Sequence, residues 1–289
     1  MSNALHYGLQ PALLLFALAL WATLPSPEVA FVVGIFASQV ILGILESRRP
    51  ARPEWKIDAR LRGVHIVVFI ALLAAGAGVG DLYSSYLAAP LSELRASWNM
   101  DIWPHAWPSL IQLLMVFVMS EFIWYWVHRA EHRWPLIWRV SGHGAHHAFK
   151  KLGALNGGLN HPFELFLLLF PAAAIELLFG VGGAAAGAAL LLGTQAAVVH
   201  ANVHLNTAGI GWLLTTGRHH IHHHSVVLEE SNTNYGCAII LWDRLFGTYS
   251  NGATTETGTG PTEPSLWQKF QMPFVEPDDT AIAPGVGAG

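Results

Sequence analysis

Histidine is the residue whose number and spacing in this sequence point most directly to chemistry. Of its 16 histidines, 13 lie between His128 and His224, a window that holds about a third of the 289 residues. Ten of them form four clusters: His128-x-x-x-His132, His143-x-x-His146-His147, His200-x-x-x-His204 and His220-x-x-His223-His224. On a helix, spacings of three and four residues place side chains on one face about one turn apart, so two imidazoles can hold one ion.

The number of clustered histidines predicts more than one metal ion. Ten imidazoles exceed the roughly six ligands of an octahedral ion, so two ions with about five nitrogens each and open positions account for them better. Iron, zinc, copper and nickel all accept nitrogen ligands, and ligand type alone does not choose among them. A single histidine pair arises by chance, and a tract such as His219–His224 can bind metal adventitiously, but four clusters in one region favour a built site.

Composition points to a membrane as the solvent of this chain. Hydrophobic residues make up 53% of it and charged residues 12%, and the mean hydropathy is +0.40. Soluble domains carry about 25% charged residues. The formal charge of −4 supplies no basic field for nucleic acid. The single cysteine, Cys237, excludes an internal disulfide framework and a cysteine-based zinc ribbon.

Six apolar runs must position the clusters. They are Leu9–Leu24, Val29–Leu45, Val64–Gly80, Ser109–Val127, Phe163–Gly180 and Val181–Val199. A membrane-spanning helix needs roughly 17–25 residues, and the second, third, fourth and sixth runs are the strongest candidates. The first run is short and the fifth is interrupted by Glu164, Pro171 and Glu176, so partial or tilted insertion is the alternative for these two.

Lysine and arginine orient the chain in the membrane. Six lie between Glu46 and Arg62 and five between Arg129 and Lys151, whereas the predicted loop Asp81–Pro108 carries only Arg95. The positive-inside rule then places all four clusters on the cytoplasmic side. We predict an all-α, multi-pass membrane bundle with a cytoplasmic histidine-rich helical cap that holds a dinuclear metal site. Residues 1–107 would be N-terminal transmembrane helices, 108–250 the catalytic domain and 251–289 an irregular tail, with its last ten residues disordered.

With their flanks, the clusters resemble the fatty acid hydroxylase / sterol desaturase superfamily of integral-membrane non-haem di-iron enzymes. The resemblance covers roughly residues 120–249. It rests on Tyr125-Trp-Val-His-Arg-Ala-Glu-His132, His143-Gly-Ala-His-His147, Asn160-His-Pro-Phe-Glu164, His200-Ala-Asn-Val-His204, His220-Ile-His-His-His224 with Ser225, Asn234-Tyr-Gly236 and Trp242-Asp-Arg-Leu-Phe-Gly-Thr248. It implies that the ten clustered histidines ligate two iron ions, with zinc an alternative in a purified sample, and that dioxygen is the co-substrate. His219-x-x-His222-His223 is a second register, but Ser225 favours the one that ends at His224.

Six further residues are expected to support the ligands without touching the metal: Glu121, Tyr125, His161, Glu164, Asn202 and Asn234. Carboxylates often orient ligating imidazoles, and a carboxylate within an apolar helix is costly enough to suggest a function. There are plainer alternatives. His161 could be a further ligand or a polar residue at a helix entry, Glu121 could be hydrated, and the asparagines could make turns. No catalytic residue beyond the metal centre is expected.

The sequence therefore predicts an oxygen-dependent hydroxylase or desaturase that acts on an acyl chain, sterol or related lipid. It contains no Gly-rich dinucleotide fingerprint and no haem or iron–sulfur motif, so a separate partner must deliver electrons: a cytochrome b5-like protein, a ferredoxin or a reductase. Two alternatives are a membrane transporter or sensor that binds zinc or nickel, and a structural membrane protein stabilised by zinc. No nucleic-acid partner is expected.

Overall fold

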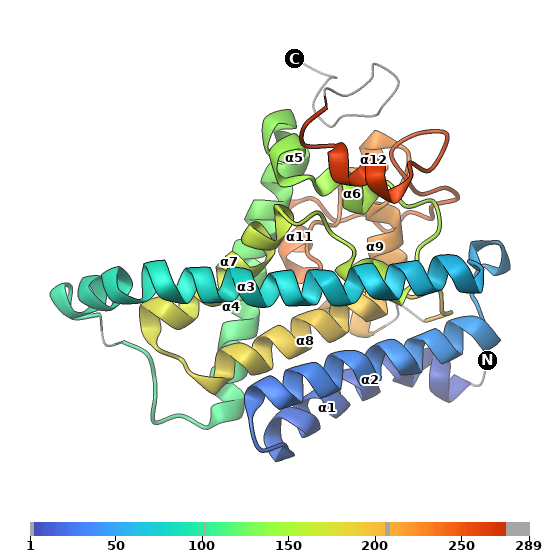
Figure 1. Ribbon diagram of the computed structural model, residues 1–289. Coiled ribbons are helices and arrows are strands. Elements are labelled where there is room, and N and C mark those ends of the chain that lie inside the picture. The colour runs from blue at the N-terminus through green and yellow to red at the C-terminus, as the bar shows by residue number, and fades with distance from the viewer. Residues whose placement is uncertain (1–2, 101, 206–208, 276–289) are drawn as a thin grey trace.

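The computed structural model describes residues 3–100, 102–205 and 209–275, which fold into helices joined by loops (Figure 1). The long helices are α1 (Asn3–Thr23), α2 (Pro27–Arg48), α3 (Ala59–Ser97), α4 (Ser109–Arg133), α7 (Glu164–Phe179) and α8 (Gly183–His200). The short ones are α5 (Pro135–Ser141), α6 (His143–His147), α9 (Gly217–His223), α10 (Leu228–Ser231), α11 (Leu241–Phe246) and α12 (Leu266–Gln271). Three 3-10 turns are η1 (Pro53–Trp55), η2 (Ala154–Gly158) and η3 (Ile210–Trp212). The predicted all-α class is confirmed.

Each of the six apolar runs forms one long helix. Within the described ranges, four helices are long and apolar enough to cross a membrane: α2, α3, α4 and α8. These are the four runs that the sequence singled out as the strongest candidates. Side-chain caps mark where two of them begin. Ser26 accepts a hydrogen bond from the backbone N–H of Val29, and Asp58 accepts one from the N–H of Leu61.

Helix α3 differs from the prediction because it does not end near Gly80. It is 39 residues long and ends at Ser97, so the predicted loop Asp81–Pro108 was wrong over most of its length. Residues 81–97 contain four leucines and three alanines, which continue a helix after the apolar run has ended. Pro90 lies inside the helix without ending it. Tyr83 donates a hydrogen bond to the carbonyl of Phe166, at 2.6 Å, and so fastens this extension to α7.

Helix α8 lies at the centre of the long helices and packs against α1, α2 and α4, while α7 packs against α3 and α4. Figure 1 shows α1, α2, α3 and α8 running across the view in similar directions, with α4 crossing them steeply and α5, α6 and α12 gathered above α3. Small residues allow this close packing on α8. A Cβ at Gly187 would collide with the side chains of Leu113 and Trp21, so α1 and α4 approach the α8 backbone directly.

Candidate metal centre

The histidine clusters come together because four helix ends meet. His128 and His132 occupy the last two turns of α4, one turn apart on one face. Helix α8 ends at His200. The two His-x-x-His-His motifs form the short helices α6 and α9, and His224 follows α9 as its C-cap residue. Every one of these histidines is buried.

The first group consists of five histidines whose ligand atoms all lie within 4.8 Å of one another: His128, His132, His143, His147 and His223. The Nε2 atom of His128 is 3.0 Å from Nε2 of His143 and 3.0 Å from Nε2 of His223. His132 Nε2 is 3.1 Å from His143 Nε2. Helices α4, α6 and α9 all contribute to this group.

The second group consists of four histidines that meet the same criterion: His146, His200, His220 and His224. The Nε2 atom of His200 is 3.2 Å from that of His146, 3.2 Å from that of His224 and 3.0 Å from that of His220. Helices α6 and α9 serve both groups, because adjacent histidines in each motif turn to opposite sides: His146 and His147 in α6, His223 and His224 at the end of α9.

Hydrogen bonds behind the rings fix which nitrogen faces the centre. His128 Nδ1 donates to the carbonyl of Tyr235 and His223 Nδ1 to the carbonyl of Thr233, both at 2.7 Å. A neutral imidazole that donates from Nδ1 keeps a lone pair on Nε2. The Nε2 atoms of His128 and His223 therefore present two lone pairs to each other at 3.0 Å, and a cation between them removes that repulsion.

The grouped histidines are neutral at pH 7. Burial lowers the pKa of His223 well below the usual histidine value, and the imidazoles of His132 and His128 lower it further. Burial likewise lowers the pKa of His143, His147, His220 and His224, and neighbouring imidazoles add to the effect. Neutral imidazoles are the form of histidine that binds metal.

The nitrogen spacing fits metal coordination. Two nitrogens that each lie about 2.1 Å from one ion, at right angles to each other, are about 3.0 Å apart. The Nε2 contacts of both groups fall between 3.0 and 3.2 Å. In donor type, in protonation and in spacing, the residues present are those of two nitrogen-rich metal sites.

Buried carboxylates stand behind the first group. Glu164 Oε1 lies 2.7 Å from Nδ1 of His143, the position expected of a residue that orients a ligand. Glu131 Oε2 lies 3.8 Å from the same nitrogen, and neither carboxylate reaches solvent. The sequence reasoning missed Glu131. Its signal was a carboxylate placed between His128 and His132, on a helix end that had to be buried for those two to meet.

Three other expected supporting residues act through the segment 232–248, which includes α11. Glu121 Oε2 accepts hydrogen bonds from the N–H groups of Ala238 and Ile239. Tyr125 shares a hydrogen bond with Thr248 at 2.8 Å. Asn234 has a φ of 56° and binds the carbonyls of His219 and Ser250. Together they hold the segment whose Tyr235 carbonyl binds His128.

The remaining expected residues bond to other parts of the chain or belong to neither group. His161 Nε2 donates to the carbonyl of Phe270, at 3.0 Å, so this ring anchors the C-terminal segment. Asn202 bonds to the backbone of Arg52 through both of its side-chain groups. His204 is exposed and belongs to neither group. Helix α8 ends at His200 and the chain becomes extended at Ala201, so the spacing of four no longer places both rings on one face.

The alternative register of the last motif, His219-x-x-His222-His223, is not the one whose imidazoles meet the other clusters. His220, His223 and His224 belong to the two groups, whereas His219 and His222 do not. His222 bonds to Thr254 at 2.8 Å and to Ser250 at 2.9 Å. The register that Ser225 favoured is thus the one that meets the other clusters.

The C-terminal segment, residues 251–275, is fastened over the histidines. Val226 N–H donates to the carbonyl of Glu256, and Gly258 N–H donates to the carbonyl of His224. Helix α12 packs against α6, and Lys150 N–H bonds to Glu263. The segment expected to be irregular therefore carries a helix and covers the centre. The expected disorder of the last ten residues lies outside the described residues.

Comparison of the sequence with known protein families gives a match. Residues 113–248 match the fatty acid hydroxylase family, and this range contains all nine grouped histidines. This stretch is similar to a fatty acid hydroxylase domain. The resemblance drawn from the histidine motifs is confirmed, and the domain carries the ends of α4 and α8 together with α6 and α9.

Relatives of this chain include proteins named as lipid-modifying enzymes. It is 28% identical over 255 residues to the ornithine lipid hydroxylase OlsE of Rhizobium tropici, covering 84% of this chain and 75% of the relative. It is 25% identical to the alkylglycerol monooxygenase of Xenopus tropicalis, covering 50% of this chain and 31% of the relative. It is 30% identical to the very-long-chain aldehyde decarbonylase GL1-11 of Oryza sativa subsp. indica, covering 61% of this chain and 66% of the relative. No solved structure matches the chain.

Proposed function

We propose that the protein is a membrane-embedded, oxygen-dependent oxidoreductase that hydroxylates or desaturates a C–H bond of a lipid. The observation that carries this proposal is the pair of adjacent, buried, all-nitrogen groups, whose Nε2 lone pairs face one another at 3.0–3.2 Å. Relatives named as a lipid hydroxylase and a monooxygenase support the reaction class. Four helices apolar enough to span a bilayer support a substrate drawn from the membrane.

We assign one iron ion to each group. His128, His132, His143, His147 and His223 would hold the first, and His146, His200, His220 and His224 the second. His204 is left out of this ligand set because it is exposed. When bound, the iron pair would supply the reduction of dioxygen and the removal of hydrogen from an unactivated C–H bond. Electrons would come from a separate donor, such as a cytochrome b5-like protein, a ferredoxin or a reductase.

The chain's own residues orient the ligands and keep water out. Backbone carbonyls of Tyr235 and Thr233 hold their imidazoles in one tautomer. Glu164 does the same for His143. The segment 251–275 covers the centre, which favours a dry site in which a reactive species does not escape to solvent.

The basic loop between α2 and α3 supports a cytoplasmic position for the centre, by the positive-inside rule. We keep the proposed division into transmembrane helices at 1–107, a catalytic domain at 108–250 and a tail at 251–289. A zinc or nickel transporter has no support among these relatives, which are named as lipid-modifying enzymes.

The test is oxygen uptake by the purified, iron-loaded protein with a reductant and a lipid extract. We expect dioxygen consumption together with lipid products that mass spectrometry finds heavier by one oxygen atom or lighter by two hydrogens. The His223→Ala variant should give neither. Iron-loaded protein that consumes no dioxygen under these conditions would contradict the proposal.

A further inference from the structure

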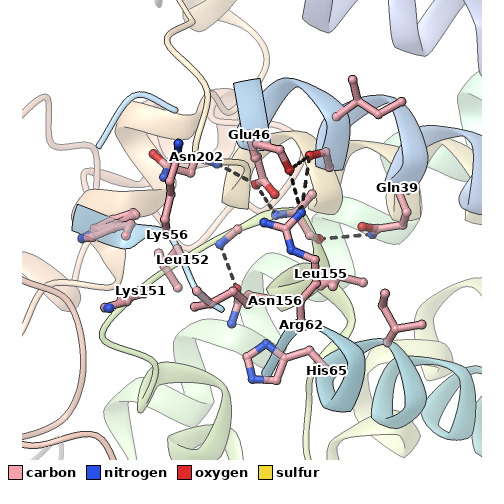
Figure 2. Close-up of a pocket in the computed structure, with 18 of the residues that line it drawn as sticks. Gln39, Glu46, Lys56, Arg62, His65, Lys151, Leu152, Leu155, Asn156 and Asn202 are labelled. Atoms are coloured by element: carbon pink, nitrogen blue, oxygen red, sulfur yellow. Dashed lines mark hydrogen bonds between the residues drawn. The ribbon is translucent and has the colours of Figure 1, made fainter. Parts of the chain in front are cut away.

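A cavity lies between α2 and α3. It has a volume of about 430 Å³, and none of the nine grouped histidines lines it. Its apolar wall is formed by Phe36, Val40, Ile44, Ile66 and Phe69. Its other end carries charge, from Glu46, Arg48, Lys56, Arg62 and Lys151. Figure 2 shows Glu46 and Arg62 close together within this polar part, with Asn156 and His65 nearby.

The charges of the polar end do not balance within the protein. Glu46 already accepts two backbone hydrogen bonds, from the N–H groups of Ala154 at 2.7 Å and Asn202 at 2.9 Å. Arg62 bonds to the Ser47 hydroxyl at 2.9 Å. Across the described part of the chain, none of the four cations that line this cavity lies within 4.0 Å of a carboxylate. The cavity thus presents a surplus of positive charge.

Two polar groups of the lining lack a hydrogen-bond partner among the described residues. The Nδ2 atom of Asn156 is one, on a side chain with 3% of its surface exposed, and the Oε1 atom of Gln39 is the other. A buried amide without a partner costs free energy. A bound polar group that accepts from Asn156 would remove that cost.

The position of the cavity along α2 and α3 indicates that its occupant is a lipid. It lies where α2 ends and α3 begins, beside the basic loop 49–58, and both helices are apolar enough to span a bilayer. Residues at such a level meet lipid head groups, and cations there attract anionic ones. The exposed apolar side chains of Val40, Ile44 and Ile66 continue the wall toward the acyl region.

We propose that this cavity binds one acyl lipid by an anionic head group, a phosphate or a carboxylate. Arg62, Lys56 and Lys151 bind the anion, Asn156 donates a hydrogen bond to it, and the first part of the acyl chain lies against Phe36 and Phe69. The wall is shared with the segments that carry the histidines, because Lys151 follows the end of α6 by four residues and Asn202 follows His200 by two. The inference does not depend on which reaction the metal centre performs.

Two pairs of variants test the site. Arg62→Gln with Lys151→Gln removes two lining cations, and its charge-matched control, Arg49→Gln with Arg60→Gln, removes two from the same region that do not line the cavity. Gly43→Leu adds a side chain at a lining position where a Cβ meets nothing within 4 Å. Gly63→Leu, which is equally unobstructed and outside the lining, is its control. A leucine is a better helix former than glycine, so both should fold.

The measurement is binding to the purified full-length protein in neutral detergent, by native mass spectrometry and titration. The probes are dioctanoyl phosphatidate, dodecanoate, dioctanoylglycerol and inorganic phosphate. We expect one equivalent of phosphatidate or dodecanoate to bind at least about tenfold more tightly than dioctanoylglycerol and inorganic phosphate, because both halves of the cavity contribute. The comparison of phosphatidate with dodecanoate identifies the head group.

The binding affinities of the variants test whether the lipid binds in this cavity. The double variant and Gly43→Leu should each weaken binding about tenfold or more, and both controls should stay within about twofold of the unmodified protein. Equal binding by all five proteins would overturn the site. So would inorganic phosphate that binds as tightly as phosphatidate, or dioctanoylglycerol that binds as tightly as either anion.

Discussion

In the first histidine group, three of the five rings have a partner behind them: His128 on a backbone carbonyl, His223 on another and His143 on Glu164. In the second group, His200 bonds to the carbonyl of Ala196 in its own helix. The Nδ1 atoms of His220 and His224 have no hydrogen-bond partner among the residues described. The nitrogen spacing is nearly the same in both, so spacing alone does not distinguish them.

The difference lies in how strongly each group is prepared for a cation. Three rings of the first group are held by tertiary contacts from α7 and the segment 232–248, and the buried side chains of Glu164 and Glu131 lie 2.7 Å and 3.8 Å from Nδ1 of His143. Ligands oriented in this way bind metal more tightly, because less freedom is lost on binding. We therefore expect the first group to bind its ion more tightly than the second.

Loss of a ligand should give the largest effect and tests whether there are two sites at all. His223→Ala and His200→Ala should each lower the metal content from two ions to one and reduce turnover by more than about 100-fold, since changes behind a ligand already cost about 10–100-fold. Metal analysis by mass spectrometry and a turnover assay measure this. His204→Ala is the control, and we expect it to retain both ions. Loss of an ion in that variant would return His204 to the ligand set.

Replacing a residue that hydrogen-bonds to a ligand should have a smaller effect on metal binding, and that effect should be confined to one group. Glu164→Gln removes the carboxylate that orients His143 and should weaken metal binding in the first group about 10–100-fold, leaving the second unchanged. Titration against a competing chelator measures both affinities. Glu176→Gln, near the other end of α7, is the matched control. Equal weakening of both groups by Glu164→Gln would show that they are not separate sites.

The order of metal loss should reveal the asymmetry in the unaltered protein. A chelator should remove the ion of the second group about tenfold faster than that of the first, because the hydrogen-bond partners behind metal ligands contribute about 10–100-fold to metal affinity. Metal content followed over time should fall in two phases. A single phase that removes two ions together would contradict the expected difference.

The smallest effect should come from Lys269, which is buried in the segment that covers the centre and pairs with Glu263 at 2.7 Å. Burial lowers the pKa of Lys269 to about 8, and Glu263 only partly opposes this. An unfolded lysine keeps its proton to about pH 10.4. Between pH 8 and 10 the unfolded chain therefore binds more protons, and the free energy of unfolding rises with pH.

Lys269→Met should remove this dependence. At pH 7.5 we expect the Tm of the variant to be a few degrees higher than that of the unmodified protein. We expect this difference in Tm to become smaller as the pH approaches 10. Thermal unfolding at several pH values measures it. A gain that grows with pH would mean that the ammonium group stabilises the fold.

Much of this structure could be predicted from the sequence, because the signals were periodic or local. Apolar runs located all six long helices, and the spacing of four residues placed His128 with His132 and His143 with His147. The flank at Ser225 selected the register of the last cluster. The behaviour of His204 could not be predicted, because it depends on where α8 ends, and helix ends are decided by tertiary contacts.

Partners that are distant along the chain also escaped prediction. Glu164 meets His143 across 21 residues and Glu121 meets Ala238 across 117. The spacing of residues in a single sequence does not indicate contacts between residues so far apart along the chain. The extension of α3 beyond Gly80 was missed because hydropathy detects where a membrane run ends and not where a helix ends. Glu131 was overlooked because a carboxylate between two histidines looks like a surface residue until both histidines are buried.

Anomalous X-ray scattering at the iron edge, from crystals of the iron-loaded protein, tests the central claim most directly. Two ions, one within each histidine group, should give two peaks, the first near Nε2 of His128 and His223 and the second near Nε2 of His200 and His220. A single peak, or peaks bound by exposed histidines such as His204, would contradict it.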